Sequence, residues 1–296
     1  MIGFCSGIIT AMITPFDSGG NVNLSELGKM IEYQISCGTD AVVILGTTGE
    51  PSTMTKAEKT EIIKYSVDNF KKYIKIIVGT GSNDTRKAVA ASRHAEELGA
   101  DGIIAVTPYY NRCTQQGLYL YYKAICDSVK LPVIAYNVPT RTGVNILPET
   151  AAKIAAISNM AGIKEASGNM TQVVKTMRNI RGRIDLYSGE DLLNLPILTI
   201  GGAGLISVTS NIAPALVKKM YTLIKENRLD EANKIQDTLI PLTGACFLEV
   251  NPIPIKAAYN MLGFNAGVPR SPLTELTEEN KIKLQNEIDR AGLRKI

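Results

Sequence analysis

The residue that most directly suggests chemistry is Lys164, which ends the short apolar run 161–163 and opens a polar loop that reaches Gly168. Lysine is rarely buried without a partner. Where a lysine amine is buried, the loss of solvation makes its neutral, nucleophilic form available. An amine of this kind forms a Schiff base with a carbonyl substrate. The alternative is a lysine at a strand end whose amine reaches solvent, and this segment alone does not separate the two.

A pair of threonines follows another short apolar run. Gly46 and Gly49 flank Thr47 and Thr48. Glycines beside hydroxyls leave backbone N–H groups free to hold a carboxylate, although a glycine turn capped by the threonines is the alternative. No Gly-Lys-Ser/Thr follows, so this segment is not a P-loop.

Two tyrosines and an arginine also lie at or just after the ends of short apolar runs. Tyr110 follows the fourth apolar run, Tyr136 ends the fifth, and Arg141 lies in the turn after it. A phenol can relay protons, and a guanidinium can form a bidentate contact with a carboxylate. The alternatives are packing of Tyr109 and Tyr110 at an interface and a surface arginine in a turn.

Short apolar runs alternate with longer amphipathic segments along the chain. The runs are rich in isoleucine and valine and too short for helices, as expected of buried parallel strands. Thr55 and Glu58 have the spacing of a capping box at the start of a helix. The predicted strands are 8–13, 41–45, 74–78, 102–106, 133–136, 162–163, 184–187 and 204–208. The predicted helices between and after them are 23–36, 55–70, 84–98, 116–129, 148–157, 170–180, 191–199 and 214–226.

Eight strands, each followed by a helix, predict an α/β fold, a (β/α)₈ TIM barrel formed by residues 1–226. A doubly wound sheet is the alternative, but eight regular repeats without a dinucleotide fingerprint favour the barrel. The glycine-rich stretch 201–204 is assigned to strand eight, and phosphate binding is not expected there. Only helices are predicted after residue 226, so 227–296 is expected to form a C-terminal helical domain, with helices at 229–242, 253–262 and 274–291.

The polar loops are expected on one face, because TIM barrels carry their chemistry at the C-terminal ends of the strands. That face would combine an amine, phenols, hydroxyls, a guanidinium and free backbone amides. The set lacks a phosphate cradle or a metal cluster and suits carbon–carbon bond chemistry on a keto acid. The lysine would form an imine with the keto carbon while phenol and hydroxyl groups relay protons.

Composition and charge argue against a nucleic-acid-binding, a membrane-spanning or a secreted protein. The chain has 296 residues, 45% of them hydrophobic, and a net charge of +4, which is ordinary for a globular protein and gives no basic stripe for nucleic acid. No apolar run reaches the ~18 residues of a membrane span, and residues 1–14 lack the basic start of a signal peptide. Five scattered cysteines without a CxxC pair indicate reduced thiols in the cytoplasm: Cys5, Cys37, Cys113, Cys126 and Cys246.

Cys113 lies in a predicted loop and could be a reactive thiol, but its pairing with a histidine is not expected. The single histidine, His94, falls inside a predicted helix and is expected at its surface. A catalytic pair between His94 and Cys113 is therefore not expected, nor is a structural zinc site. A metal site built from carboxylates alone has no clustered acidic motif to support it.

Five motifs occur in order along the chain: Gly-Thr-Thr-Gly-Glu at 46–50, Thr-Pro-Tyr-Tyr-Asn at 107–111, Tyr-Asn-Val-Pro at 136–139 with Arg-Thr-Gly at 141–143, Lys-Glu-Ala-Ser-Gly at 164–168, and Asn-Pro-Ile-Pro at 251–254. Together they closely resemble the dihydrodipicolinate synthase family of pyruvate-dependent class I aldolases, which also contains N-acetylneuraminate lyase. The likeness covers essentially the whole chain. Arg141 and the lysine loop favour the synthase branch, because the lyase branch usually lacks this arginine and follows its lysine with different residues.

The resemblance implies that pyruvate condenses with L-aspartate 4-semialdehyde to give 4-hydroxy-tetrahydrodipicolinate, in lysine and diaminopimelate biosynthesis. It implies no cofactor beyond a covalent imine with pyruvate, and a homotetramer built as a dimer of dimers. Tyr110 would reach across the tight dimer interface into the neighbouring site. The residue roles that it implies are imine formation for Lys164, a proton relay for Tyr136, Thr47 and Tyr110, carboxylate binding for Thr48 and Arg141, and backbone lining of the pocket for Gly189 and Ile206.

One region departs from the family pattern. Members that are inhibited by lysine bind it at the dimer interface with small polar, histidine and glutamate side chains. Here those positions hold Pro51, Lys56, Lys59 and Lys87, while Asn83 and Tyr109 are retained. Three lysines should repel a cationic amino acid, so weak or absent inhibition by L-lysine is expected. Two other functions remain open, another pyruvate aldolase for sialic or 2-keto-3-deoxy sugar acids and a protein that binds a keto acid without turnover.

Overall fold

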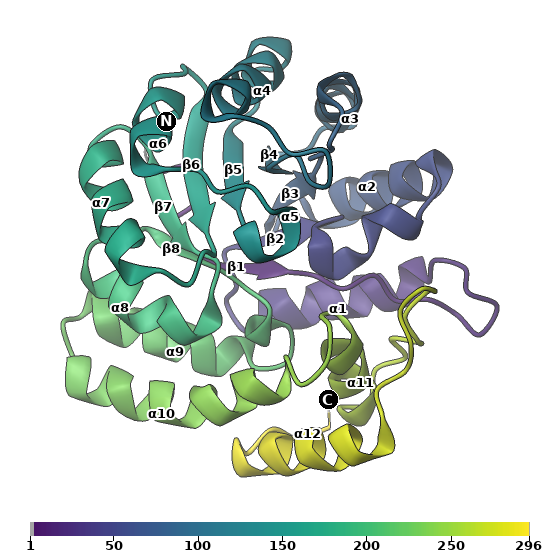
Figure 1. Cartoon of the computed structure of the whole chain (residues 1–296). Coiled ribbons are helices and arrows are strands. Elements are labelled where there is room, and N and C mark those ends of the chain that lie inside the picture. The colour runs from purple at the N-terminus through teal and green to yellow at the C-terminus, as the bar shows by residue number, and fades with distance from the viewer. Residues whose placement is uncertain (1–2, 296) are drawn as a thin grey trace.

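The chain folds into a closed barrel of eight parallel strands in sequential order (Figure 1). A computed structural model describes residues 3–295. Each strand pairs with its neighbours along the chain, and β8 closes the ring against β1. The predicted (β/α)₈ barrel is therefore confirmed, and the doubly wound alternative is wrong. The strands are β1 Gly7–Ala11, β2 Ala41–Ile44, β3 Lys75–Gly79, β4 Gly102–Val106, β5 Val133–Asn137, β6 Met160–Glu165, β7 Asp185–Ser188 and β8 Gly204–Ser207.

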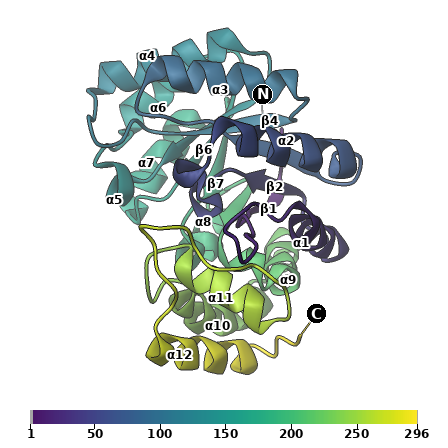
Figure 2. The same cartoon turned by 90° about the vertical axis from the view of Figure 1, so that its right-hand side faces the viewer.

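Helices surround the barrel, and the last ones lie together on one side of it (Figure 2). No helix among residues 3–295 is long and apolar enough to cross a membrane. The division of the chain at residue 226 stays a prediction. The α-helices are α1 Leu24–Ser36, α2 Lys56–Phe70, α3 Thr85–Glu97, α4 Gln115–Ser128, α5 Pro139–Thr142, α6 Pro148–Ile154, α7 Met170–Ile180, α8 Asn194–Thr199, α9 Pro214–Lys225, α10 Leu229–Ala245, α11 Ile253–Met261 and α12 Glu278–Arg290. Short 3₁₀ turns are η1 Thr47–Gly49, η2 Pro51–Thr53, η3 Asp191–Leu193 and η4 Thr209–Asn211.

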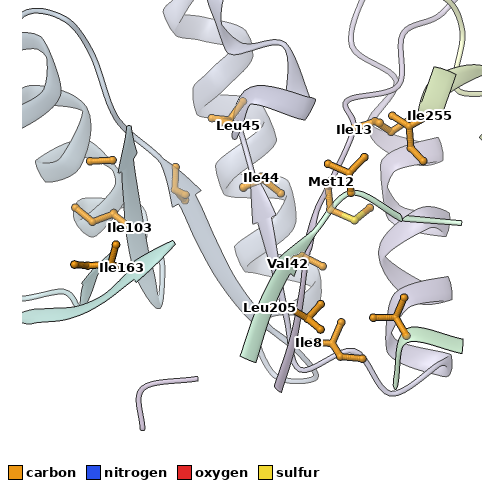
Figure 3. Packing of buried hydrophobic residues seen from close by; sticks show 14 of the residues in the cluster. Ile8, Met12, Ile13, Val42, Ile44, Leu45, Ile103, Ile163, Leu205 and Ile255 are labelled. Atoms are coloured by element: carbon orange, nitrogen blue, oxygen red, sulfur yellow. The ribbon is translucent and has the colours of Figure 1, made fainter. Parts of the chain in front are cut away.

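Alternation along the strands produces two apolar layers. Side chains such as Ile8, Val42 and Ile163 point outward and pack against the helices, whereas Ile9 and Val43 belong to a smaller cluster inside the barrel. Successive side chains of a strand point to opposite faces, and both faces are covered, so the strands read as continuous apolar runs. Figure 3 shows members of the outer layer, including Ile255 of α11, which ties the C-terminal helices to the same core.

Local signals place several helix starts. Thr55 caps α2 through a capping box with Glu58, as predicted. A side-chain cap of this kind stabilises a helix by about 1 kcal/mol. The predicted helix 191–199 is divided into η3 and α8, and α5 was not predicted.

One detail of the sequence prediction is wrong. Gly201 and Gly202 lie ahead of β8 rather than within it, because a tight turn there brings the backbone against Ile197. His94 lies on the helix α3 as predicted and is half-buried, and its Nε2 lies 2.9 Å from Thr60 Oγ1 of α2. The first two residues of the stretch 1–14 and the last residue of 227–296 lie outside the described residues.

Candidate active site

Lys164 is the next-to-last residue of β6, and its side chain enters the barrel mouth. Only 5% of the residue is exposed, so the alternative of a lysine that reaches solvent is wrong. In the parallel register Lys164 pairs with Tyr136 on β5, and its Nζ lies 4.3 Å from the centroid of the Tyr136 ring. A buried amine against an aromatic face is poorly hydrated and held in one place. This position suits a nucleophile.

Glycine at position 189 makes room for that amine. A Cβ built on Gly189 would lie 2.8 Å from both Cγ and Cε of Lys164 and 3.0 Å from Ala166 Cβ. Any other side chain would displace the lysine stem. Ile206, on β8, is buried in the inner apolar cluster. Gly189 therefore lies against Lys164, whereas Ile206 is placed only in the apolar interior of the barrel.

The threonine pair lies in η1, after β2. Thr48 is 2% exposed, and its hydroxyl oxygen accepts a hydrogen bond of 3.0 Å from Asn251 Nδ2. Thr47 is half-buried beside it. The turn is sharp because Leu45 and Glu50 both adopt left-handed backbone conformations, with φ of 55° and 56°.

Arg141 lies in α5, after β5, and is exposed. Its Nη2 donates a hydrogen bond of 3.4 Å to the backbone carbonyl of Asn251. Asn251 thus contacts both predicted carboxylate binders, Thr48 with its side chain and Arg141 with its backbone. The sequence reasoning did not assign Asn251 a role, although the motif at 251–254 was the signal that could have found it.

Tyr110 does not join the other site residues within one chain. It is 92% exposed and has a φ of 68°, and its phenol forms no hydrogen bond with any residue between 3 and 295. A non-glycine residue held at positive φ carries a local cost. The fold therefore holds Tyr110 in a backbone conformation that costs free energy, with its phenol exposed.

A second buried lysine lies beneath the threonine turn. Lys256 of α11 is 1% exposed, and its Nζ lies 2.7 Å from Glu50 Oε1. Lys256 Nζ lies 3.9 Å and Arg270 Cζ 4.3 Å from the centroid of the Phe16 ring. Arg270 also donates its backbone N–H to Glu50 at 2.9 Å. We call Phe16, Glu50, Lys256 and Arg270 the clamp cluster, because it fastens the C-terminal segment to the active-site turn.

Burial lowers the pKa of Lys256 to about 8, and the charge and hydrogen bond of Glu50 oppose that shift. The amine is therefore a second nucleophile candidate by its pKa alone. Its hydrogen bonds to Glu50 and to the Val268 carbonyl occupy the amine. The two lysines thus differ in partners rather than in burial.

Replacing Lys256 with methionine is expected to destabilise the fold by about 3–5 kcal/mol, because Glu50 would remain buried without its counter-charge. Urea unfolding of the two proteins measures the difference. The double variant Lys256→Met, Glu50→Gln should recover part of the loss. Lys72→Met, on an exposed lysine, is the matched control. A loss no larger than that of the control would show that the pair is not stabilising.

A polar network on the outer face of the barrel fixes the register of β5 and β6. Asn137 and Glu165 are register partners on the outer face, and Asn137 Nδ2 lies 3.0 Å from Glu165 Oε2. The Ser167 N–H donates to Glu165 at 2.7 Å, and the Ile146 N–H donates to Asn137 Oδ1 at 2.9 Å. Because side chains alternate along a strand, fixing this pair outside also fixes Tyr136 against Lys164 inside.

The assembled mouth is a site for a carbonyl compound that carries a carboxylate. It offers one buried amine, a phenol against it, a hydroxyl turn and a guanidinium. No group of three or more potential metal-ligating histidine, cysteine or acidic side chains is found in the described part of the chain. All five cysteines there are unpaired.

Comparisons with known proteins give one consistent result. The sequence model of the Dihydrodipicolinate synthetase family matches residues 4–291. The chain is 47% identical over 287 residues to 4-hydroxy-tetrahydrodipicolinate synthase 1 of Clostridium acetobutylicum, covering 97% of this chain and 98% of that protein. Its fold matches the dihydrodipicolinate synthase of Acinetobacter baumannii in complex with pyruvate, with a TM-score of 0.95, 39% identity and coverage of 98% of this chain and 99% of that one.

A structure of the enzyme from Cyanidioschyzon merolae with lysine bound is similar to the same degree, with a TM-score of 0.95, 36% identity and coverage of 98% of this chain and 99% of that chain. The match of the family model over nearly the full length, together with these identities, leads to one conclusion: the chain belongs to the dihydrodipicolinate synthetase family.

Proposed function

We propose that this protein is a lyase of the class I aldolase type, a 4-hydroxy-tetrahydrodipicolinate synthase that condenses pyruvate with L-aspartate 4-semialdehyde in lysine and diaminopimelate biosynthesis. The names of its curated relatives support the activity. The observation that carries the chemistry is the buried Lys164 amine 4.3 Å from the Tyr136 ring centroid, on the rim that also holds Thr48 and Arg141.

The reaction begins when the Lys164 amine attacks the keto carbon of pyruvate and water leaves, which gives an imine. Thr48 and the free backbone amides of its turn hold the pyruvate carboxylate. The imine withdraws electrons, so a methyl proton is lost and an enamine forms. This step needs no metal or further cofactor, because the covalent imine itself serves as the electron sink.

The enamine carbon then attacks the aldehyde carbon of the semialdehyde, and a carbon–carbon bond forms. The amine of the second substrate attacks the imine carbon, the bond to Lys164 breaks, and the ring closes. Tyr136, Thr47 and Tyr110 carry protons between these steps. Arg141 holds the semialdehyde carboxylate by a bidentate contact.

Tyr110 supplies its phenol to the site of a neighbouring subunit, so the working unit is at least a dimer. What supports this is its exposure of 92% and its outward presentation within a single chain. A homotetramer that pairs two such dimers follows from the family resemblance.

A side-by-side assay of aldehydes tests the function. Pyruvate is incubated with L-aspartate 4-semialdehyde, N-acetyl-D-mannosamine or D-glyceraldehyde, and pyruvate consumption is measured. We expect consumption with the semialdehyde to exceed that with either sugar aldehyde by at least about 100-fold, because a site that hydrogen-bonds one substrate rejects analogues that leave those groups unpaired. Faster consumption with a sugar aldehyde would favour the other aldolases. Pyruvate binding without consumption in any mixture would favour a keto-acid-binding protein.

Feedback inhibition by L-lysine is expected to be weak. Lys56 and Lys87 are exposed and Lys59 is half-buried, and burial lowers the pKa of Lys59. A like charge at about 4 Å costs about 1 kcal/mol in water and more near a protein surface. Activity at 1 mM lysine should therefore stay above about half of its uninhibited value. Half-inhibition at sub-millimolar lysine would contradict the prediction. Lys87→Glu should increase the sensitivity.

A further inference from the structure

The loop that carries Tyr110 is fastened to the segment that carries Arg141. We call residues 107–114, between β4 and α4, the Tyr110 loop, and residues 139–147, which comprise α5 and the chain up to α6, the Arg141 segment. Three contacts connect the two, at the start of the Tyr110 loop, near its middle and just past its end. The contact positions advance together along both segments, so the loop is held along its length rather than at one point.

The first contact is a buried pair of hydroxyl groups. Thr107 directly follows β4 and is fully buried, and Thr142 ends α5 and is 5% exposed. The Thr107 hydroxyl donates a hydrogen bond of 3.0 Å to the Thr142 hydroxyl, its one hydrogen-bond partner among residues 3–295. Thr142 is fixed within its own segment, because its oxygen accepts the Val144 N–H at 3.2 Å and lies 3.2 Å from the Val138 carbonyl oxygen. A buried hydroxyl that lost its partner would cost free energy, so this link is specific.

The other two contacts lie nearer the surface. A Cβ built on Gly143 would lie 2.9 Å from Arg112 Nε, so the guanidinium packs against a position that has no side chain. Gly143 also has a φ of 69°, which glycine adopts without strain at the end of a helix. Gln115, the first residue of α4, donates through Nε2 to the Asn145 carbonyl at 2.8 Å, and its Oε1 accepts the Leu147 N–H at 3.2 Å. One amide thus binds the Arg141 segment twice.

The backbone of the Tyr110 loop needs this support. Tyr110 and Arg112 have φ of 68° and 55°, and non-glycine residues persist in such conformations only where their surroundings hold them there. On its other side the loop is held by Asn111, whose Nδ2 donates to the Asn83 carbonyl in the loop after β3 at 3.0 Å. The contacts on the two sides therefore fix the direction in which the exposed phenol is presented.

We propose that Thr107 and Thr142 are positioning residues that serve two active sites at once. Through Thr142, the residue after Arg141, the pair holds the guanidinium beside Lys164 of its own chain. Through Thr107, it holds Tyr110 for the site of the neighbouring subunit. A disturbance of this one hydrogen bond therefore reaches both sites, although both threonines are buried and neither is assigned a contact with substrate. The inference rests on the proposed function, which gives Arg141 and Tyr110 these roles.

Thr107→Val is the test, because valine has the shape of threonine and lacks the hydroxyl. A misplacement of about 1 Å can cost about 10²-fold in rate, and loss of one link should displace the loop by less. We therefore expect kcat to fall about tenfold, KM for L-aspartate 4-semialdehyde to rise about fivefold and KM for pyruvate to change by less than about twofold. Thr107→Ser keeps the hydroxyl and should restore both constants. Thr176→Val is the matched control, because Thr176 is 1% exposed and its hydroxyl has no partner among residues 3–295.

Mixed oligomers separate the two effects. When Thr107→Val is refolded with a large excess of Lys164→Arg, nearly every working site combines Lys164 and Arg141 of a Thr107→Val chain with Tyr110 of a Lys164→Arg chain. KM for the semialdehyde should stay raised, and kcat per working site should return to the wild-type value. When the wild type is refolded with a large excess of the double variant Thr107→Val, Lys164→Arg, the split should reverse: kcat falls and KM stays at the wild-type value.

A merely structural role does not produce this crossover between kcat and KM. If both constants move together in the two mixtures, or if Thr107→Val behaves like Thr176→Val, the proposal is overturned. Arg112→Ala is the second variant and decides the matter if Thr107→Val does not fold, because Arg112 is exposed; it should give the same crossover with smaller changes. The wild type is assayed first. If it forms no product from pyruvate and the semialdehyde, the proposed function fails; if it does and no crossover is seen, only this inference fails.

Discussion

Replacement of Lys164 by arginine is expected to reduce kcat/KM by at least about 10³-fold, as removal of a covalent nucleophile does in other enzymes. Arginine keeps the positive charge, but its guanidinium is not deprotonated in proteins and forms no imine. Charge and approximate length are thus preserved while nucleophilicity is lost. Coupled turnover with both substrates measures the change. Lys175→Arg, on an exposed lysine of α7, is the control and should be unaffected.

Borohydride reduction in the presence of pyruvate locates the reactive amine. The wild type should acquire a stable adduct at Lys164, and Lys164→Arg should acquire none. Lys256 is the informative competitor, because it is also buried and its pKa is lowered to about 8. Peptide mapping decides between them. An adduct at Lys256, or the absence of any adduct, would overturn the imine mechanism as assigned.

Mixing two inactive variants is expected to restore activity if Tyr110 works in the neighbouring subunit. In a dimer of Tyr110→Phe with Lys164→Arg, one site combines both defects and the other has neither. Random exchange of a C₂ dimer then gives about a quarter of all sites intact. The measured rate after unfolding and refolding the mixture should approach that share of the wild-type rate. The physical reason is the 92% exposure of Tyr110 in a single chain.

The control for this experiment is each variant refolded alone, which should stay inactive. A mixture of Tyr110→Phe with Tyr136→Phe is the second pairing and should also recover, because Tyr136 contacts Lys164 of its own chain. No recovery in either mixture would show that Tyr110 acts within its own chain or not at all. The outcome therefore tests the dimer and the relay together.

The C-terminal helices participate in the site rather than merely covering the barrel. Asn251 lies between Thr48 and Arg141, and the clamp cluster fastens the threonine turn from below. The two parts of the chain that meet here are about 200 residues apart in sequence. The entropic cost of closing a loop grows slowly with its length. A contact between segments this far apart in sequence is therefore tolerated.

Much of the fold was determined by the sequence alone. Runs of isoleucine and valine mark buried strands wherever they occur, because both faces of a parallel sheet must be apolar. The Thr55–Glu58 pair marks a helix start because its hydrogen bonds are local. Lys164, Tyr136, Thr48 and Arg141 stood out because their loops follow strands, and in a barrel that position is the active face.

Tertiary structure alone decided the rest. Whether Lys164 is buried depends on Gly189, which directly follows β7, and on Tyr136 of β5, and neither is near it in sequence. Glu190 and Asp191 are neighbours with the same charge, and only the folded chain shows that Asp191 accepts hydrogen bonds from the backbone of Val208 and Thr209, just after β8. Periodicity and capping are written in residues a few positions apart, whereas partners and burial are set when distant strands close the barrel and exclude water from between them.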